Sequence, residues 1–217
     1  MSRTRLVIIL LSLAIVGLAF LLLLVGTVYI PAGEVLRILG GEPSERQAWN
    51  FIVWESRVPL IATAALAGAA LAVSGLLLQT SFGNVLADPS ILGISTGSSL
   101  GVAVVMLAFG GVIGSAAVGY VATLFGALLG ALLIMAILLA FSVAVKNSTM
   151  LLIVGILISY LASSAISLLN FAATQEGVHS FVVWGLGNFS GVTLRQLPVY
   201  ASVVAVGLIA SLLLIRS

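Results

Sequence analysis

Residues 6–30 read LVIILLSLAIVGLAFLLLLVGTVYI, a run without a single Asp, Glu, Lys, Arg or His. An α-helix needs about 20 such residues to cross the hydrocarbon layer of a bilayer. Charge-free stretches of similar length follow at residues 60–78, 91–109, 112–145, 150–173 and 197–215. Because the strands of a transmembrane barrel alternate over about 10 residues, these lengths exclude a barrel and predict an all-α, polytopic transmembrane helical bundle.

The composition supports a membrane protein. Hydrophobic residues make up 62% of the chain and charged residues 6%, which is more apolar than a soluble core of this size requires. Residues 112–145 are too few for two spans and a turn, so we predict one span there, at residues 117–141, and six in all. Six spans place both termini on one side, and Arg3 and Arg5 favour the cytoplasm. We expect residues 1–217 to form a single transmembrane domain.

Two polar segments separate the first three spans. In the first, we predict a short interfacial helix over Ala32–Leu39, with Val35, Leu36 and Leu39 on one side and Glu34 and Arg37 on the other. The second, residues 79–90, reads QTSFGNVLADPS and predicts irregular backbone at the membrane edge. Such backbone is either a plain interhelical turn or the lining of a cavity, and the residues leave both open.

Small residues recur every four positions in the middle spans, as in Ala64, Gly68 and Ala72. This spacing lets helix backbones approach closely where lipid provides no hydrophobic drive for association. We therefore predict helix-packing roles for seven glycines: Gly68, Gly75, Gly93, Gly97, Gly101, Gly126 and Gly130.

Several classes of function are disfavoured by what the chain lacks. Ion-coupled carriers usually keep carboxylates or histidines within their spans, and the six stretches hold none. The chain has no cysteine for a thiolate metal site and no G-x-x-x-x-G-K-[ST] motif for ATP. We expect no metal, no cofactor and no nucleic-acid partner. A membrane subunit powered by a separate ATPase fits these observations.

An intramembrane serine protease is a less favoured alternative. Residues 93–97, GISTG, match the G-x-S-x-G pattern and would make Ser95 the nucleophile. The single histidine, His179, lies in the hydrophilic stretch after the fifth span, away from Ser95. We interpret the two glycines as packing residues and expect no catalytic residues.

Four segments together resemble the signature of the FecCD permeases. They are residues 57–60 (RVPL), 68–79 (GAALAVSGLLLQ), 84–97 (NVLADPSILGISTG) and 184–191 (WGLGNFSG). Members of this family are the membrane subunits of ABC importers for iron-siderophore complexes, haem and vitamin B12. The resemblance covers essentially the whole chain and implies a multi-pass protein of the bacterial inner membrane that translocates one of these cargoes.

The resemblance also implies partners. We expect a separate ATP-binding subunit, an extracytoplasmic substrate-binding protein and a second permease subunit, as a homo- or heterodimer within membrane lipid. It implies that Arg57 docks the binding protein, although Leu60 replaces the companion arginine of the family. Asn84, Leu86, Ser148 and Thr149 are implied as residues of the cytoplasmic gate.

The family pattern continues beyond this chain, which resembles roughly the N-terminal six of ten helices. We therefore expect a truncated, split or degenerate product. The alternative function that follows is a non-transporting pseudopermease or membrane scaffold.

Overall fold

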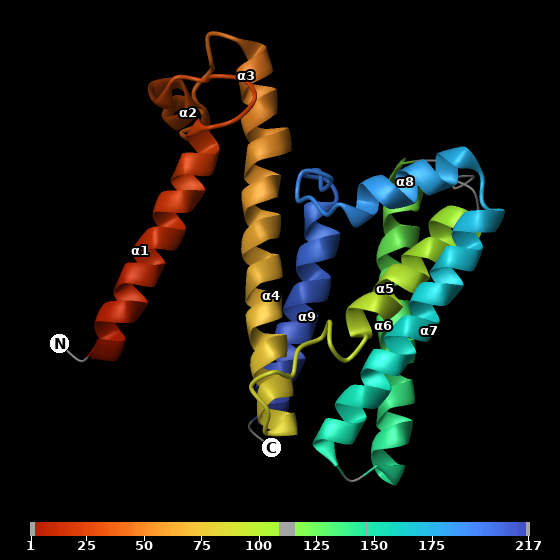
Figure 1. Cartoon of the computed structure of the whole chain (residues 1–217). Coiled ribbons are helices and arrows are strands. Elements are labelled where there is room, and N and C mark those ends of the chain that lie inside the picture. Colours follow the sequence, from red (N-terminus) through yellow and green to blue (C-terminus); the bar gives the residue numbers. More distant parts are fainter. Residues whose placement is uncertain (1–2, 109–115, 146, 216–217) are drawn as a thin grey trace. The chain divides into compact units, whose positions relative to one another are not determined.

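The computed structural model describes residues 3–108, 116–145 and 147–215, and over these residues it is helical without a strand (Figure 1), which confirms the predicted all-α class. The helices are α1 (Arg3–Leu24), α2 (Ala32–Leu39), α3 (Gln47–Ile52), η1 (Val53–Arg57), α4 (Val58–Phe82), α5 (Ile94–Ala103), η2 (Val104–Ala108), α6 (Ala116–Ala144), α7 (Ser148–Ala172), α8 (Gln175–Gly185) and α9 (Leu197–Ile215). The η segments are single π-helical turns.

The chain divides into two compact units. Unit 1 comprises Met1–Ala69 with Phe189–Ser217, and unit 2 comprises Ala70–Asn188. One boundary falls within the continuous helix α4, and the other falls in the connection between α8 and α9. A single transmembrane domain therefore stays a prediction, and each unit is described by itself.

Among the described residues, five helices are long and apolar enough to cross a membrane: Arg3–Leu24, Gln47–Phe82, Val118–Ala144, Ser148–Ala172 and Leu197–Leu214. The third predicted stretch forms the shorter helix Ile94–Ala108. It is shorter because the preceding residues fold into turns that end at Gly93, whose φ of +80° lies in the left-handed region. The count of six spans and the cytoplasmic placement of both termini stay predictions.

The core of unit 1 lies where the end of α1 meets α2 and η1. Ile30, Val35, Ile38 and Val53 are buried together there. The predicted bounds of α2 are confirmed, but its predicted faces are partly wrong: Leu36 is 55% exposed, whereas Glu34 is buried. Glu34 can be buried because Arg37, Ser44 and the amide of Glu45 all donate hydrogen bonds to its carboxylate.

Unit 2 is built on three packed helices, α5, α6 and α7, with α8 crossing the end of this group (Figure 1). Its apolar core consists of Leu92, Ile134, Leu138 and Leu152. Leu92 comes from the connection before α5, so this core ties the connection to α6 and α7. The irregular backbone predicted at residues 79–90 is confirmed from residue 83 onward and extends to residue 93, whereas residues 79–82 belong to α4.

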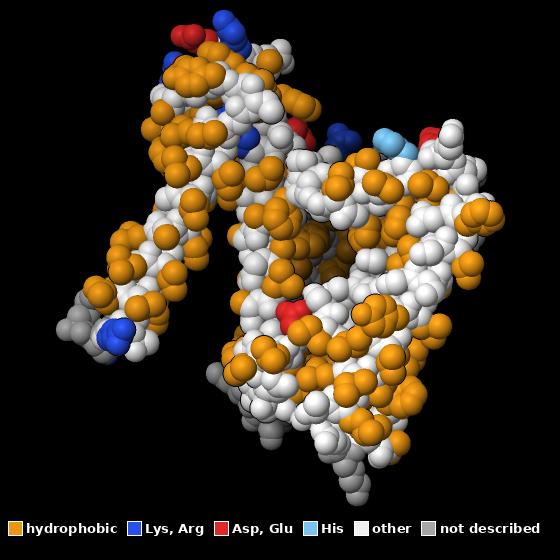
Figure 2. All heavy atoms as spheres, in the orientation of Figure 1, with side chains coloured by type: hydrophobic (Ala, Val, Ile, Leu, Met, Phe, Trp, Pro, Cys, Tyr) orange, Lys and Arg blue, Asp and Glu red, His pale blue; other side chains and the backbone are white. Residues whose placement is uncertain are grey.

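Many large hydrophobic side chains are exposed at the surface of the protein. No residue of α1 is buried, and Figure 2 shows hydrophobic side chains along this helix with Lys or Arg side chains at its free end. An apolar helix exposed on all sides needs an apolar solvent, which a bilayer supplies. The exposure of α1 is therefore what a lipid-facing span requires.

Candidate functional site

The connection from α4 to α5 contains two of the predicted gate residues, Asn84 and Leu86. Gly83, at a φ of +56°, ends α4, and the amides of Gly83 and Asn84 donate back to the carbonyls of Thr80 and Gln79 at 3.3 and 3.1 Å. This pair of bonds is the Schellman arrangement that closes many helices. The carboxamide of Asn84 then accepts a 2.9 Å hydrogen bond from the amide of Leu86, which holds a tight turn.

The first turn of α7 contains the other two predicted gate residues, Ser148 and Thr149. Asn147 caps this helix: its side-chain oxygen accepts a 2.9 Å hydrogen bond from the amide of Thr149. Both predicted gate residues are exposed. Their helix and the α4–α5 connection meet in the core of unit 2, where Leu92 packs near Leu152. This core joins the end of the connection to α7, but Asn84, Leu86, Ser148 and Thr149 are not among its residues, so the gate role stays a prediction.

The same connection packs closely against α7. A Cβ atom added to Gly93 would lie 2.5 Å from the Ser159 hydroxyl oxygen and 3.0 Å from the carbonyl oxygen of Gly155. One added to Gly155 would lie 2.9 Å from the Cα atom of Leu92. No side chain fits at either glycine without a backbone shift. Gly155 was not among the predicted packing glycines, although its spacing of four residues from Ser159 follows the same small-residue pattern.

The helices α5 and α6 cross at four of the predicted packing glycines. A Cβ atom on Gly97 would lie 2.6 Å from the carbonyl oxygen of Gly130, and one on Gly126 would lie 3.0 Å from that of Gly101. Cβ atoms on Gly101 and Gly130 would also overlap the facing backbone. The two backbones are in direct contact here, which only glycine permits.

The two predicted packing glycines of α4 have a different environment. A Cβ atom on Gly68 or Gly75 would meet nothing within 4 Å. Leu71 and Leu76, which flank this part of the helix, are 64% and 63% exposed. Within its own unit each of these glycines has room for a side chain, and the helix-packing role of Gly68 and Gly75 stays a prediction.

Arg57, the predicted docking residue, is buried. Only 6% of it is exposed, and its guanidinium donates hydrogen bonds to the carbonyl oxygens of Leu23, Leu24 and Val28. The bond to Leu24 measures 3.3 Å and the bond to Val28 2.6 Å. Docking of a binding protein by Arg57 stays a prediction, and it would require the guanidinium to leave these carbonyls.

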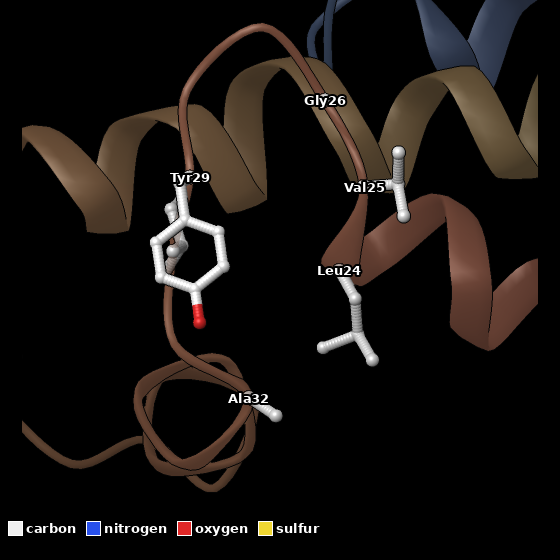
Figure 3. A pocket seen from close by; sticks show the side chains of 6 residues that line it. Leu24, Val25, Gly26, Tyr29 and Ala32 are labelled. Atoms are coloured by element: carbon white, nitrogen blue, oxygen red, sulfur yellow. The ribbon is translucent and has the colours of Figure 1, made fainter.

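Recesses occur in both units. In unit 1, Leu24 and Tyr29 lie on opposite sides of a recess of about 270 Å³ that separates the end of α1 from α2 (Figure 3). In unit 2, Asn170, Gln175 and His179 contribute to a recess where α7 turns into α8. A second recess of unit 2 is lined by hydroxyl side chains, including that of Ser95.

The arrangement gives no support to the protease alternative. Ser95 and His179 line different recesses of unit 2. The hydroxyl of Ser95 lies 3.4 Å from the hydroxyl of Ser90. Within the described residues there is no group of three His, Cys, Asp or Glu side chains that could hold a metal ion.

Comparisons with known proteins agree on one family. The model of the FecCD transport family matches residues 7–217. The vitamin B12 import system permease BtuC of Klebsiella pneumoniae is 33% identical over 172 residues, which are 79% of this chain and 48% of that protein. The BtuC protein of Vibrio cholerae is 33% identical over 169 residues, which are 75% of this chain and 50% of that protein. The chain therefore spans about half the length of these relatives.

A solved structure shows the same architecture. A metal-chelate type ABC transporter in an inward-facing conformation superposes on this chain with a TM-score of 0.67 and a sequence identity of 27%. The match covers 89% of this chain and 56% of the transporter chain. With its long apolar helices, this chain is a multi-pass protein of the bacterial inner membrane. The match of residues 7–217 shows that the chain belongs to the FecCD transport family.

Proposed function

We propose that the chain is a permease subunit of a binding-protein-dependent ABC importer, with a cobalamin as its first candidate cargo and an iron chelate or haem as the others. The observation that carries this proposal is the family match over residues 7–217, joined by the 33% identity to vitamin B12 permeases. The absence of charged residues from the apolar stretches supports it, since a corridor with weak polar groups lets a bulky cargo leave without being trapped.

The energy source in this proposal is a separate ATP-binding subunit, because the chain has no phosphate-binding loop of its own. An external substrate-binding protein would select the cargo, and a second permease subunit would complete the pathway. Asn84, Leu86, Ser148 and Thr149 would form the part of the cytoplasmic gate contributed by this chain. This assignment is supported by the family resemblance of these positions, on two segments whose neighbouring residues Leu92 and Leu152 belong to the core of unit 2.

Uptake by living cells tests the proposal. The chain would be expressed with its neighbouring transport genes in a strain that lacks its own vitamin B12 permease, and uptake of radiolabelled cyanocobalamin, ferrichrome and haem would be compared. The proposal predicts saturable uptake of one cargo that disappears when the ATP-binding subunit carries an inactive catalytic site. Normal membrane levels with no uptake of any cargo would favour the non-transporting scaffold.

A further inference from the structure

Hydroxyl side chains gather around one recess of about 360 Å³ in unit 2. Its lining consists of Ser95, Thr96 and Ser99 from α5, Ser163 and Ile166 from α7, and Phe181 from α8. None of these lining residues carries an ionisable side chain. The recess therefore combines hydroxyl groups with apolar side chains and carries no charge.

The position of α8 brings Phe181 to this recess. Thr174 caps α8 by accepting a 3.2 Å hydrogen bond from the amide of Gly177. A Cβ atom on Gly177 would lie 3.0 Å from the carbonyl oxygen of Met106, so α8 packs directly on the π-helical turn that continues α5. The ring of Phe181 also stacks on Trp184, with centroids 6.0 Å apart. These contacts hold one aromatic ring beside the hydroxyls.

Two of the four hydroxyls that line the recess, those of Thr96 and Ser163, differ from neighbouring serines in how they are bonded. A serine in an apolar helix usually donates to a carbonyl of the preceding turn. Ser99 and Ser164 do so, to Ser95 and Tyr160, at 3.1 and 2.9 Å. The hydroxyls of Thr96 and Ser163 make no hydrogen bond to any residue that the structure describes. Two side chains of the recess thus keep their full capacity to donate and accept.

This capacity defines the chemistry of a ligand. An uncharged hydroxyl both donates and accepts, and so does a carboxamide, whose oxygen accepts and whose nitrogen donates. A carboxylate or phosphate would lose its hydration here without meeting a positive charge. The volume falls in the range of about 300–1,000 Å³ typical of small-molecule sites, and Phe181 and Ile166 offer apolar contact to a flat group.

We propose that this recess is a weak binding site for an uncharged, carboxamide-bearing group of the transported molecule. The proposal rests on the proposed function, since it places this face of α5, α7 and α8 along the path of the cargo. A site built from two or three hydroxyls holds its ligand loosely, as a position on a transport path must. It would favour cargoes rich in neutral amides over cargoes rich in carboxylates.

Fluorine NMR of the full chain in lipid nanodiscs tests the site. Labelling with 5-fluorotryptophan gives one signal each for Trp49, Trp54 and Trp184. Trp184 stacks on Phe181 and reports on the recess, whereas Trp49 and Trp54 lie in unit 1 and serve as internal controls. Nicotinamide and nicotinate, which share a ring and differ in carboxamide against carboxylate, would be titrated in turn. We expect a saturable shift of the Trp184 signal with nicotinamide and a much weaker response to nicotinate.

Matched variants locate the binding. Ser163→Ala and Thr96→Val should each weaken nicotinamide binding about threefold to tenfold, the effect of one lost hydrogen bond. Ser164→Ala is the control, because its hydroxyl already bonds to Tyr160 and lies outside the recess lining. Thr96→Val keeps the side-chain volume, so it preserves the test if Ser163→Ala fails to fold. Equal affinity in the parent and in both recess variants would overturn the proposal, as would a lack of saturation or equal binding of nicotinate.

A second titration tests the carboxamide site independently of the proposal that cobalamin is the cargo. Cyanocobalamin and ferrichrome are both neutral and rich in amides, and each would be titrated against the same signal. A response to ferrichrome alone would keep the carboxamide site and contradict cobalamin as the cargo. A response to neither molecule, together with no response to nicotinamide, would overturn the site whether or not cells expressing the chain take up cobalamin.

Discussion

The Nη2 atom of Arg57 donates a 2.6 Å hydrogen bond to the carbonyl oxygen of Val28, just beyond the end of α1. The last carbonyls of a helix have no partner within that helix, and basic side chains often supply one. Gly26 leaves the room for this contact, since a Cβ atom there would lie 3.0 Å from the same guanidinium nitrogen. The hydrogen bonds of Arg57 therefore connect the end of α1 and the segment after it to η1, which continues into α4.

Replacing Arg57 should accordingly destabilise unit 1. Arg57→Leu removes every donor and leaves several carbonyls unpaired, which we expect to cost about 1–3 kcal/mol of unfolding free energy. Arg57→Lys should recover part of this loss. Thermal unfolding in detergent, with hydrogen exchange of residues 23–28, would measure the effect.

The control for this experiment is Arg37→Gln. The side chain of Arg37 is 49% exposed and pairs with Glu34 and Glu42. Neither pair involves residues 23–28, so Arg37→Gln should leave the hydrogen exchange of these residues unchanged. Unchanged stability and exchange in Arg57→Leu, combined with weaker association with the binding protein, would show that Arg57 acts by docking.

The glycines of α5 and of α4 should respond differently to a large side chain. Gly97→Leu places its Cβ atom against the backbone of α6, and we expect a loss of at least about 1–3 kcal/mol and little protein in the membrane. Gly68→Leu meets nothing within 4 Å and should accumulate normally when the chain is expressed alone. Quantitative immunoblots of membrane fractions would compare the two, and equal accumulation would contradict the close crossing of α5 and α6.

The predicted gate can be followed with a single thiol, because the chain contains no cysteine. Leu86 is 69% exposed in the turn held by Asn84, so Leu86→Cys should react readily with a water-soluble maleimide. In the complex with an ATP-binding subunit, addition of a non-hydrolysable ATP analogue should change this labelling rate by about tenfold or more if the turn takes part in gating. Val143→Cys, 82% exposed on α6, is the control. The same nucleotide response at both positions would argue against a gate at Leu86.

Acid should loosen α2. Desolvation alone would raise the pKa of Glu34, but hydrogen bonds from the amide of Glu45 and the hydroxyl of Ser44, together with the charge of Arg37, outweigh it and hold that pKa below 4.5. The ionised carboxylate therefore stabilises the folded state above the unfolded-state pKa of about 4.5. This contribution is lost as the pH falls through the lower folded-state pKa.

The fluorescence of Trp49, which packs against the same core, would report this loss during a titration from about pH 6 to about pH 3. Glu34→Gln should remove the transition, and Glu176→Gln, on an exposed position of α8, should leave it unchanged. An identical acid transition in the parent and in Glu34→Gln would show that another group is responsible.

The lengths of the apolar stretches predicted the long helices well, because the formation of such helices depends mainly on local composition. The stretch at residues 197–215 coincides with α9, and the short helix Ala32–Leu39 was predicted with its observed bounds. The face that α2 buries could not be predicted, since the burial of Glu34 depends on donors from Ser44 and Glu45 in a loop that follows it.

The remaining differences between the predictions and the structure arise from contacts between segments that are far apart in the sequence. The bonds from Arg57 to the end of α1 join residues about thirty positions apart, and no local pattern indicates them. Gly97 and Gly68 share the same small-residue spacing, but only Gly97 faces a neighbouring backbone. The hydroxyls of Thr96 and Ser163 became a candidate site only when α5, α7 and α8 were seen to surround one recess.

ATP-driven transport in proteoliposomes tests the central claim most directly. The chain would be reconstituted with its ATP-binding subunit and, where the genome encodes one, a second permease subunit. The binding protein would be loaded with radiolabelled cyanocobalamin, ferrichrome or haem. The account predicts accumulation of one cargo that requires both ATP and the binding protein, and that is lost when this chain alone is omitted. An assembled complex that hydrolyses ATP but gives the same accumulation with and without this chain would contradict its role as the permease subunit.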